Sequence, residues 1–423
     1  MARAIKEQRL KEPETQRTGM RKFLTALGPG MISGASDNDP TTVATMAVIG
    51  STVVYRLSWL TILIYPMLSG IQIISARIGT VTKRGLQRDV AKFYGRGWGM
   101  VLLVSVLAVN AITLAADLEG GAAALAVPTH VDYRWFIIPF AVGVLLMLVF
   151  GSYRAVERIL KWVLLVFVAY IFAAFAAHPD WGTVLRDTVL PSVSFNSTYI
   201  QAALALLGTT LTSYAYVWET IEEAEERPSI QELGLAQADA GIGMLFAVVV
   251  FWFIEIATGA TLGIHHKQVQ TAQEAAQSLA PIAGPIASYL FSAGLLASAI
   301  LAVPVLAATS AYVLGHEFGW RSGLSHSPWR ATKFYMALVI SLLIGAVIAF
   351  SGVQPIHLLF VASIVGGLGT PISMVFLLLV AQNRRLMGDR AIGRTLRAIG
   401  WGTWAIVTSI SLYFLWQQIA GLL

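Results

Sequence analysis

The sequence predicts an all-α integral membrane protein, and three observations lead to that fold class. First, 56% of the 423 residues are hydrophobic and only 12% are charged, with a mean hydropathy of +0.69, whereas about a quarter of the residues in a soluble protein are charged. Second, the apolar residues form runs long enough to cross a membrane, at about 20 residues per crossing. Third, strand-type alternation is absent, which argues against an outer-membrane barrel. A large soluble domain is therefore excluded.

Composition also excludes several kinds of site. The chain contains no cysteine, so it has no disulfide framework, zinc–thiolate site, iron–sulfur cluster or thiol nucleophile. The net charge of +6 lies in loops between apolar runs, which indicates membrane topology. The expected partners are therefore the lipid bilayer and a small solute, with no nucleic acid and no obligatory protein partner.

The N-terminal segment, residues 1–23, carries charges of both signs and runs into an apolar stretch without the cleavage site of a signal peptide. We expect it to be cytoplasmic and to precede a single transmembrane domain over residues 24–423. That domain is predicted to contain about eleven spanning helices. Their approximate ranges are 24–50, 56–78, 97–126, 134–152, 157–177, 198–224, 235–263, 283–313, 332–351, 354–381 and 396–421.

Lysine and arginine are concentrated in the loops that follow the second, fourth, eighth and tenth spans. Because cytoplasmic loops carry an excess of these residues, the pattern predicts a cytoplasmic N-terminus and an external C-terminus in a multi-pass protein of the plasma (inner) membrane. The basic residues of these loops are Lys83, Arg84, Arg88, Lys92, Arg96, Arg154, Arg158, Lys161, Arg321, Arg330, Lys333, Arg384, Arg385, Arg390, Arg394 and Arg397.

Two predicted spans contain residues that a membrane helix normally excludes. The first span contains the sequence GASDNDPTT over residues 34–42, and the sixth contains GTTLTSY over residues 208–214. An Asp at the bilayer centre costs about 2.5–3.5 kcal/mol on insertion scales, and proline removes a backbone donor. Interrupted helices at corresponding places in two halves indicate a midplane binding site in an inverted-repeat transporter. The alternatives are a proline-kinked helix with a paired Asp39, and hydroxyl contacts between helices in the sixth span.

These stretches, together with others in the same order along the chain, resemble the Nramp family of divalent-metal transporters. The matching strings are GPG at 28–30, GASDNDP at 34–40, SARIG at 75–79, ADL at 116–118, LGTT at 207–210, LAVPVLAA at 301–308 and NRRLMG at 383–388. The resemblance implies a LeuT-like fold, with inverted five-helix repeats over about 24–177 and 198–381 and an eleventh helix over about 396–421. It also implies transport of divalent cations by alternating access.

Departures from the family pattern affect the expected metal site. Thr42 stands where the family has asparagine, and Thr212 stands where transition-metal members have methionine. The resemblance then implies a metal site of Asp39, Thr42, the Thr209 carbonyl and Thr212. Such oxygen ligands suit Mg²⁺ and Mn²⁺, and a partly hydrated Mg²⁺ fits one carboxylate with several hydroxyls. The sequence is most similar to the Nramp-related branch associated with magnesium; the ion is substrate, and no cofactor is expected.

Other polar residues are expected around this site or along the ion pathway. Asp117 matches the family's helix-three aspartate, associated with proton movement, but Gly120 and Tyr214 stand where family members carry titratable groups, so metal entry without proton coupling is predicted. The acidic run at 219–226 is either a cytoplasmic exit for cations or a solvated helix end, and Glu255 is interpreted as a satisfied buried glutamate. The outer-shell and pathway candidates are Asp37, Asn38, Thr210, Tyr214, Glu219 and Asp117.

The sequence bears on four other functions. A proton-coupled transition-metal (Mn/Fe) transporter of the same family is the first alternative. An organic-solute transporter of LeuT-like fold is disfavoured because Asp37 and Asp39 would repel a substrate carboxylate. The chain has no Ser/His/Asp spacing, His-Glu-x-x-His motif or phosphate loop, so an enzyme is not expected, while a non-transporting metal sensor stays open.

Overall fold

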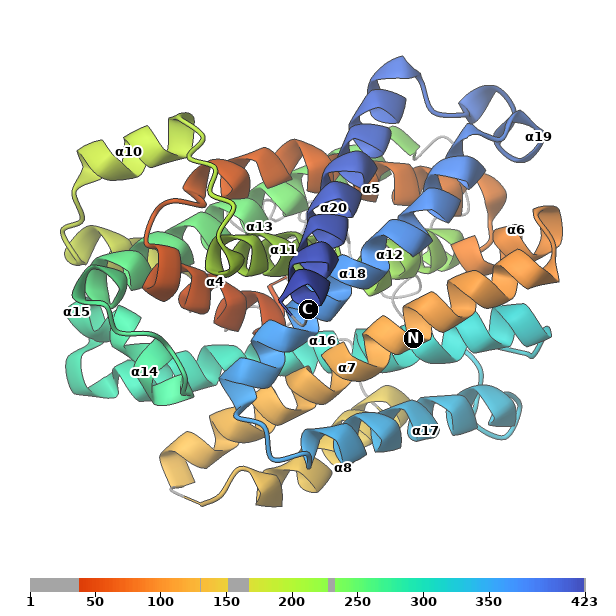
Figure 1. Cartoon of the computed structure of the whole chain (residues 1–423). Helices are drawn as coiled ribbons and strands as arrows, with labels where there is room; N and C mark the ends of the chain where they lie inside the picture. Colours follow the sequence, from red (N-terminus) through yellow and green to blue (C-terminus); the bar gives the residue numbers. More distant parts are fainter. Residues whose placement is uncertain (1–37, 130, 151–166, 227–232, 422–423) are drawn as a thin grey trace, which may run out of the picture.

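The computed structural model describes residues 38–129, 131–150, 167–226 and 233–421, and within these ranges the chain is almost entirely helical (Figure 1). Among the described residues, eight helices, counting the interrupted stretch Ser197–Glu225 as one, are long and apolar enough to cross a membrane, and three shorter apolar helices accompany them. Each of the eleven predicted spans overlaps one of these. The long or apolar helices are α4 (Pro40–Val53), α5 (Ser58–Thr82), α7 (Arg96–Thr129), α8 (Arg134–Phe150), Phe167–Ala176, α11 (Ser197–Thr210), α12 (Ser213–Glu226), α13 (Leu233–Thr261), α16 (Ala287–Phe318), α17 (Thr332–Ala349), α18 (Pro355–Gln382) and α20 (Arg394–Ala420).

Short helices lie at the two ends of the bundle (Figure 1). The helices α6 (Leu86–Phe93) and α19 (Arg384–Met387) lie at one end. At the opposite end lie α10 (Trp181–Val189), α14 (Ala272–Ala276) and α15 (Ala280–Ala283). The first end carries the basic loops that follow the second and tenth spans, so it is the end that the sequence predicts to be cytoplasmic.

Corresponding helices of the two halves of the chain make corresponding contacts. In the first half α4 starts after Asp39 and packs against α13, and in the second half α12 follows a break and packs against α5. Likewise, α7 packs against α17 as α16 packs against α8, and α7 and α16 pack against each other. This exchange is the pattern expected of two inverted five-helix repeats.

Close helix contacts are made where glycine removes a side chain. A Cβ on Gly208 of α11 would lie 1.9 Å from the Ser363 carbonyl oxygen of α18 and 2.3 Å from the Gly367 backbone nitrogen. Small residues allow such approaches in membrane helices, where apolar burial alone does not drive association. The close contact fixes the end of α11, next to Thr209, against α18.

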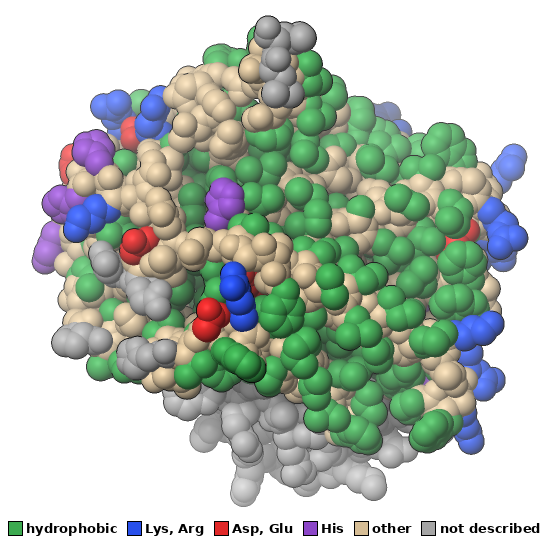
Figure 2. All heavy atoms as spheres, turned by 60° about the horizontal axis from the view of Figure 1, so that its bottom comes forward, with side chains coloured by type: hydrophobic (Ala, Val, Ile, Leu, Met, Phe, Trp, Pro, Cys, Tyr) green, Lys and Arg blue, Asp and Glu red, His purple; other side chains and the backbone are tan. Residues whose placement is uncertain are grey.

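The outer surface is apolar where helices would meet lipid. In Figure 2, hydrophobic side chains cover much of the face formed at the bottom of Figure 1, where α8 and α17 lie, and Lys and Arg side chains lie mainly at its two edges. Trp135 and Phe150 on α8 and Val347 on α17 are each more than 70% exposed. Exposed apolar surface of this extent is expected of a face that contacts the hydrocarbon of a bilayer.

Candidate metal site at two helix breaks

Asp39 is the N-cap of α4, in the stretch that the sequence predicts to be the first break. Its backbone is extended (φ −69°, ψ 170°), and its Oδ1 accepts a hydrogen bond from the Thr42 backbone N–H at 2.7 Å. Pro40 occupies the first helical turn, where its missing N–H costs no helical hydrogen bond. Asp39 is 1% exposed, so the sequence places a carboxylate inside the protein, at the positive end of a helix dipole.

The second break separates α11 from α12 at Leu211 and Thr212. The Leu211 carbonyl lies at the end of α11, where carbonyls lack helical amide partners. It accepts a hydrogen bond from the Thr370 hydroxyl of α18 at 2.9 Å. The hydroxyls of Thr212 and Ser213 are buried and have no hydrogen-bond partner among the described residues. The break therefore leaves two hydroxyl groups inside the protein with unused hydrogen-bonding capacity.

The two breaks are joined by two hydrogen bonds. The Thr42 hydroxyl lies 2.8 Å from the Thr209 hydroxyl, and the Tyr214 hydroxyl donates to Asp39 Oδ2 at 2.9 Å. Asp39, Thr42, Thr209 and Tyr214, which the sequence singled out, therefore come together although more than 160 residues separate the two stretches. The contact at Thr209 involves its side chain, whereas the sequence pointed to its carbonyl.

The remaining candidates take different positions. Thr210 donates its hydroxyl to the Leu206 carbonyl of its own helix at 2.7 Å, so it makes no hydrogen bond to the site. The Asn38 carbonyl accepts a hydrogen bond from the Ser298 hydroxyl of α16, which fixes the loop before α4. Asp37 lies outside the described residues.

Asp117 lies on α7 beside the N-terminal end of α4. It is fully buried, it interacts electrostatically with Asp39 and with the Thr41 backbone, and neither of its carboxylate oxygens accepts a hydrogen bond of ordinary geometry from the described residues. Gly120 brings the two helices together, because a Cβ there would lie 3.2 Å from the Pro40 Cβ. Two buried acids near each other favour binding of a cation between or beside them.

The acidic run on α12 is not a simple solvated helix end. Glu219 and Glu223 are 4% and 3% exposed, Glu223 accepts from the Thr80 hydroxyl at 3.2 Å, and Glu225 accepts from the Tyr312 hydroxyl at 3.1 Å. The interpretation as a solvated end is wrong for Glu223, because neighbouring helices cover it, and they cover Glu219 as well. Glu219 lies nearest the break and is buried on the same helix as Tyr214.

Glu255 matches its prediction as a satisfied buried glutamate. It is fully buried on α13 and accepts hydrogen bonds from the hydroxyls of Ser58 at 3.0 Å and Thr61 at 2.8 Å, both on α5. These two contacts join α13 to α5. Both of its oxygens are engaged, so it links two helices.

Sequence reasoning missed several polar residues near the breaks and one buried acid. The hydroxyls of Ser298 and Thr370 bind backbone carbonyls at the breaks, and Thr45 of α4 lies 2.7 Å from the Ser363 hydroxyl of α18. Glu119 is fully buried, and its oxygens have no hydrogen-bond partner among the described residues that meets ordinary geometry. Single hydroxyls in apolar helices give no sequence signal, whereas Glu119 could have been found as a charge inside a predicted span.

The candidate site is poor in charged ligands. Within the part of the chain that the structure describes, no three His, Cys, Asp or Glu side chains are placed to share a metal ion. A cation bound here would therefore depend on one or two carboxylates and on neutral oxygens. Asp39, Thr42, Thr209 and Thr212 are each at most 3% exposed, so this set is closed to solvent in this conformation.

A helix interrupted at Leu211 and Thr212, packed against the helix that starts after Asp39 inside a bundle of apolar helices, places the chain in the LeuT-like class of membrane-protein folds. Solved structures agree with this assignment. A manganese transporter of Eremococcus coleocola aligns over 97% of this chain and 90% of its own with a TM-score of 0.72 at 19% identity. MhsT in complex with L-phenylalanine aligns over 90% of this chain and 98% of its own, with a TM-score of 0.57 at 16% identity.

The chain belongs to the Nramp family, because residues 30–417 match the family described as natural resistance-associated macrophage protein-like. Two relatives are each named divalent metal cation transporter MntH. The protein of Deinococcus radiodurans is 25% identical over 419 residues, which are 95% of this chain and 92% of the relative. That of Caldanaerobacter subterraneus subsp. tengcongensis is 23% identical over 383 residues, 88% of each chain.

Proposed function

We propose that this protein transports divalent metal cations, Mg²⁺ and Mn²⁺, across the cytoplasmic membrane by alternating access. The observation that carries the proposal is the buried Asp39 carboxylate at the start of α4, bonded across the second break to Tyr214. The names of the relatives support the substrate class, since two are divalent metal cation transporters and a structural neighbour is a manganese transporter.

The proposed ligands are Asp39, Thr42, Thr209 and Thr212. The hydroxyls of Thr42 and Thr209 lie 2.8 Å apart, so both can turn a lone pair towards one ion placed beside them. The Thr209 carbonyl lies in the last turn of α11, where carbonyls lack helical amide partners. Carboxylate, hydroxyl and carbonyl oxygens favour Mg²⁺ and Mn²⁺ over softer metals.

Tyr214 has a supporting role in this proposal. Its hydroxyl donates to one Asp39 oxygen, while the Thr42 backbone donates to the other. Groups that bond to a metal-binding carboxylate fix its orientation and tune its affinity. These two hydrogen bonds restrict rotation of the Asp39 side chain, so its remaining lone pairs point in a fixed direction.

Alternating access follows from the burial of this set. Asp39 and Thr42 are at most 1% exposed, so an ion reaches them only when helices move. The proposed orientation has the N-terminus cytoplasmic and the C-terminus external. Glu219, buried on α12, which packs against α6, would then line the cytoplasmic exit.

A proton-coupled transition-metal transporter is the second candidate. The observation that favours it is the proximity of the buried acids Asp39 and Asp117, because such a pair can exchange a metal ion for protons. The site itself lacks a sulfur ligand, since Thr212 occupies the break. Selectivity among metals and proton entry during metal uptake separate the two candidates.

The experiment that tests the proposed function combines binding and transport. Isothermal titration of the purified full chain with Mg²⁺, Mn²⁺ and a panel of amino acids should give saturable binding for the metals only. Uptake in proteoliposomes loaded with a metal-sensitive dye should then show metal entry. Binding of an amino acid would support an organic-solute transporter, and metal binding without uptake would support a sensor.

A further inference from the structure

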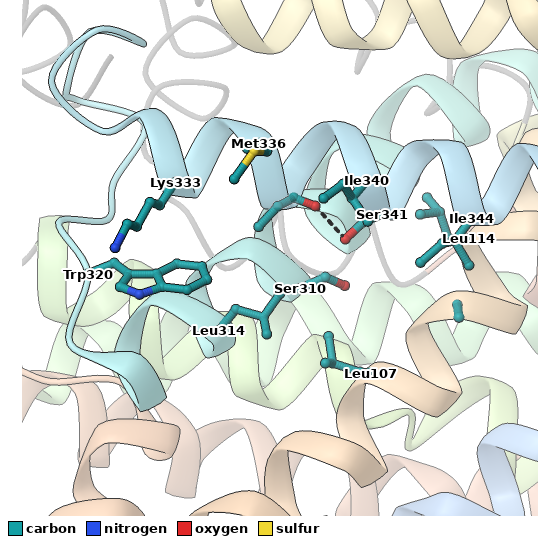
Figure 3. Close-up of a pocket in the computed structure, with 12 residues that line it drawn as sticks. Leu107, Leu114, Ser310, Leu314, Trp320, Lys333, Met336, Ile340, Ser341 and Ile344 are labelled. Atoms are coloured by element: carbon teal, nitrogen blue, oxygen red, sulfur yellow. Dashed lines mark hydrogen bonds between the residues drawn. The ribbon is translucent and has the colours of Figure 1, made fainter.

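A cavity separate from the helix breaks lies between α7, α16 and α17. Its volume is about 200 Å³, and Figure 3 shows side chains of the three helices pointing towards the same space. The lining is mainly apolar, with Leu107, Ala111, Leu114, Leu314, Trp320, Met336, Ala337, Ile340 and Ile344 together with Ser310, Ser341 and Lys333.

The polar groups inside the cavity are already bonded to the protein. The Ser341 hydroxyl donates to the Ala337 carbonyl at 2.9 Å, as drawn in Figure 3. The Ser310 hydroxyl donates to the Leu306 carbonyl at 2.9 Å and accepts from the Asn110 amide at 3.0 Å. The interior therefore offers apolar contact and suits a hydrocarbon chain better than an ion or a sugar.

Lys333 gives one end of the cavity a positive charge. Its ammonium lies 5.7 Å from the centre of the Trp320 ring, a cation–π arrangement that holds the charge at the cavity edge. Neither of the two ion pairs found among the described residues includes Lys333. Arg321 and Arg330 are also exposed in the loop before α17, so the surroundings of this end are basic.

The length of the cavity matches one leaflet of a bilayer. Lining residues run along α17 from Lys333 to Ile344, a distance of about 16 Å at 1.5 Å per residue. This is about half of the 30 Å hydrocarbon thickness. Met336, Ile340 and Ile344 are 46–54% exposed, so the cavity opens on the outer face of the bundle where lipid would lie.

We propose that this cavity binds an anionic phospholipid, with one acyl chain between α7, α16 and α17 and the phosphate group at Lys333. Charge complementarity selects this occupant, because basic residues at the ends of membrane helices attract anionic headgroups. The bound chain fills the gap between α17 and two helices of the bundle, and Leu114 lies one turn from Asp117 on α7. The lipid would therefore stabilise the α7 position beside the proposed metal site, although the inference stands without that site.

The test is native mass spectrometry of the full chain in detergent with phosphatidylglycerol or phosphatidylcholine at equal concentration. The wild type should retain phosphatidylglycerol preferentially. Lys333→Ala should weaken that binding about fivefold, the loss expected for one basic residue at the membrane surface. The matched control is Lys267→Ala, which removes an exposed lysine at the opposite end and should leave lipid retention unchanged.

A second variant tests the apolar part of the site. Ala111→Phe fills the cavity from α7 and should reduce retention of both lipids, and if that variant fails to fold, Lys333→Ala still decides the headgroup contact. Equal retention of the two lipids by the wild type, or unchanged phosphatidylglycerol binding in Lys333→Ala, would overturn the proposal. A lipid-free dimer whose dissociation follows Ala111→Phe would overturn it as well, because a second copy would then cover the face.

Discussion

Asp39 and Glu255 are both buried acids in the apolar bundle, and both accept hydrogen bonds, yet their surroundings differ. Glu255 lies within the continuous helix α13, and its partners Ser58 and Thr61 belong to one neighbouring helix. Asp39 starts a helix after a break, and its partners come from α4 and from beyond the second break. Unused hydroxyls at Thr212 and Ser213 belong to that second break. Hydrogen bonding alone therefore does not distinguish the two acids, whereas the helix start at Asp39 and the unused hydroxyls of the second break support the proposal that a metal ion binds beside Asp39.

The largest expected effect is the difference in metal uptake between variants of these two acids. Asp39→Ala removes the charged ligand and should abolish saturable Mn²⁺ uptake, whereas Glu255→Gln keeps the neutral polar contacts with α5 and should retain uptake kinetics near wild type. The measurement is initial uptake rate against metal concentration in proteoliposomes. Equal loss of uptake in both variants, with both proteins monodisperse, would break the distinction between the two acids.

Tyr214→Phe should weaken metal affinity about tenfold, within the range found when a group bonded to a metal ligand is removed. The hydroxyl that donates to Asp39 Oδ2 is lost, while the ring remains. Tyr216→Phe is the matched control, because that hydroxyl lies on the same helix and contacts Ser373 of α18 instead. Similar titration curves for both variants would show that the hydroxyl of Tyr214 does not orient the Asp39 carboxylate.

Another buried acid, Asp89 of α6, lies outside the membrane-spanning helices. Its titration predicts how folding stability depends on pH. Burial raises the pKa of Asp89 from its ordinary value of 3.8 to about 6, and Arg84, 3.7 Å away, offsets only part of that effect. Because the pKa in the folded state is the higher one, folding stability from this group is fully present below about pH 4 and is lost as pH rises through 6.

Asp89→Asn should therefore raise the thermal midpoint relative to wild type at pH 8, and this gain should shrink at pH 5. The measurement is thermal unfolding of detergent-purified protein at both pH values. Asp389→Asn, at an exposed position, is the control and should shift neither midpoint. A gain from Asp89→Asn that is equal at pH 5 and pH 8 would exclude this carboxyl as the source of the pH dependence.

The smallest expected effect is the change of internal pH during metal uptake. Asp117 lies beside Asp39, but Gly120 carries no titratable group and Tyr214 donates its hydroxyl to Asp39. We therefore predict metal entry without stoichiometric proton entry, driven by the membrane potential at about 4.6 kcal/mol per divalent ion per 100 mV. A pH reporter inside vesicles should stay constant during Mn²⁺ influx. Acidification that tracks the influx would instead assign proton movement to Asp117 and Asp39.

The sequence predicted the helices and the two breaks because both depend on local composition. Runs of apolar residues mark the spans, and the acids with Pro40 and the cluster of hydroxyls at 208–214 are costly in a membrane unless a site requires them. The sequence did not predict which side chains make contacts between helices that are distant along the chain. Nothing in the sequence distinguishes Ser298, which binds the first break, from a serine that bonds to its own helix.

Side-chain direction was likewise unpredictable from sequence. Thr209 and Thr210 are adjacent and chemically identical, yet Thr209 contacts Thr42 across the breaks while Thr210 bonds to Leu206 in its own helix. The helical rotation of about 100° between neighbours decides which hydroxyl meets the site. That rotation becomes informative only when the packing of α11 against α4 and α18 is known.

The most direct test of the account is competition between Mg²⁺ and Mn²⁺ for uptake. A site of hard oxygen ligands without sulfur should accept both ions, so Mg²⁺ in excess should inhibit Mn²⁺ uptake by the wild type. Thr212→Met should shift preference towards Mn²⁺ and Cd²⁺ by adding a thioether at the second break. If excess Mg²⁺ leaves Mn²⁺ uptake unchanged in wild-type proteoliposomes, the oxygen-ligand magnesium site is wrong and a transition-metal transporter becomes the better account.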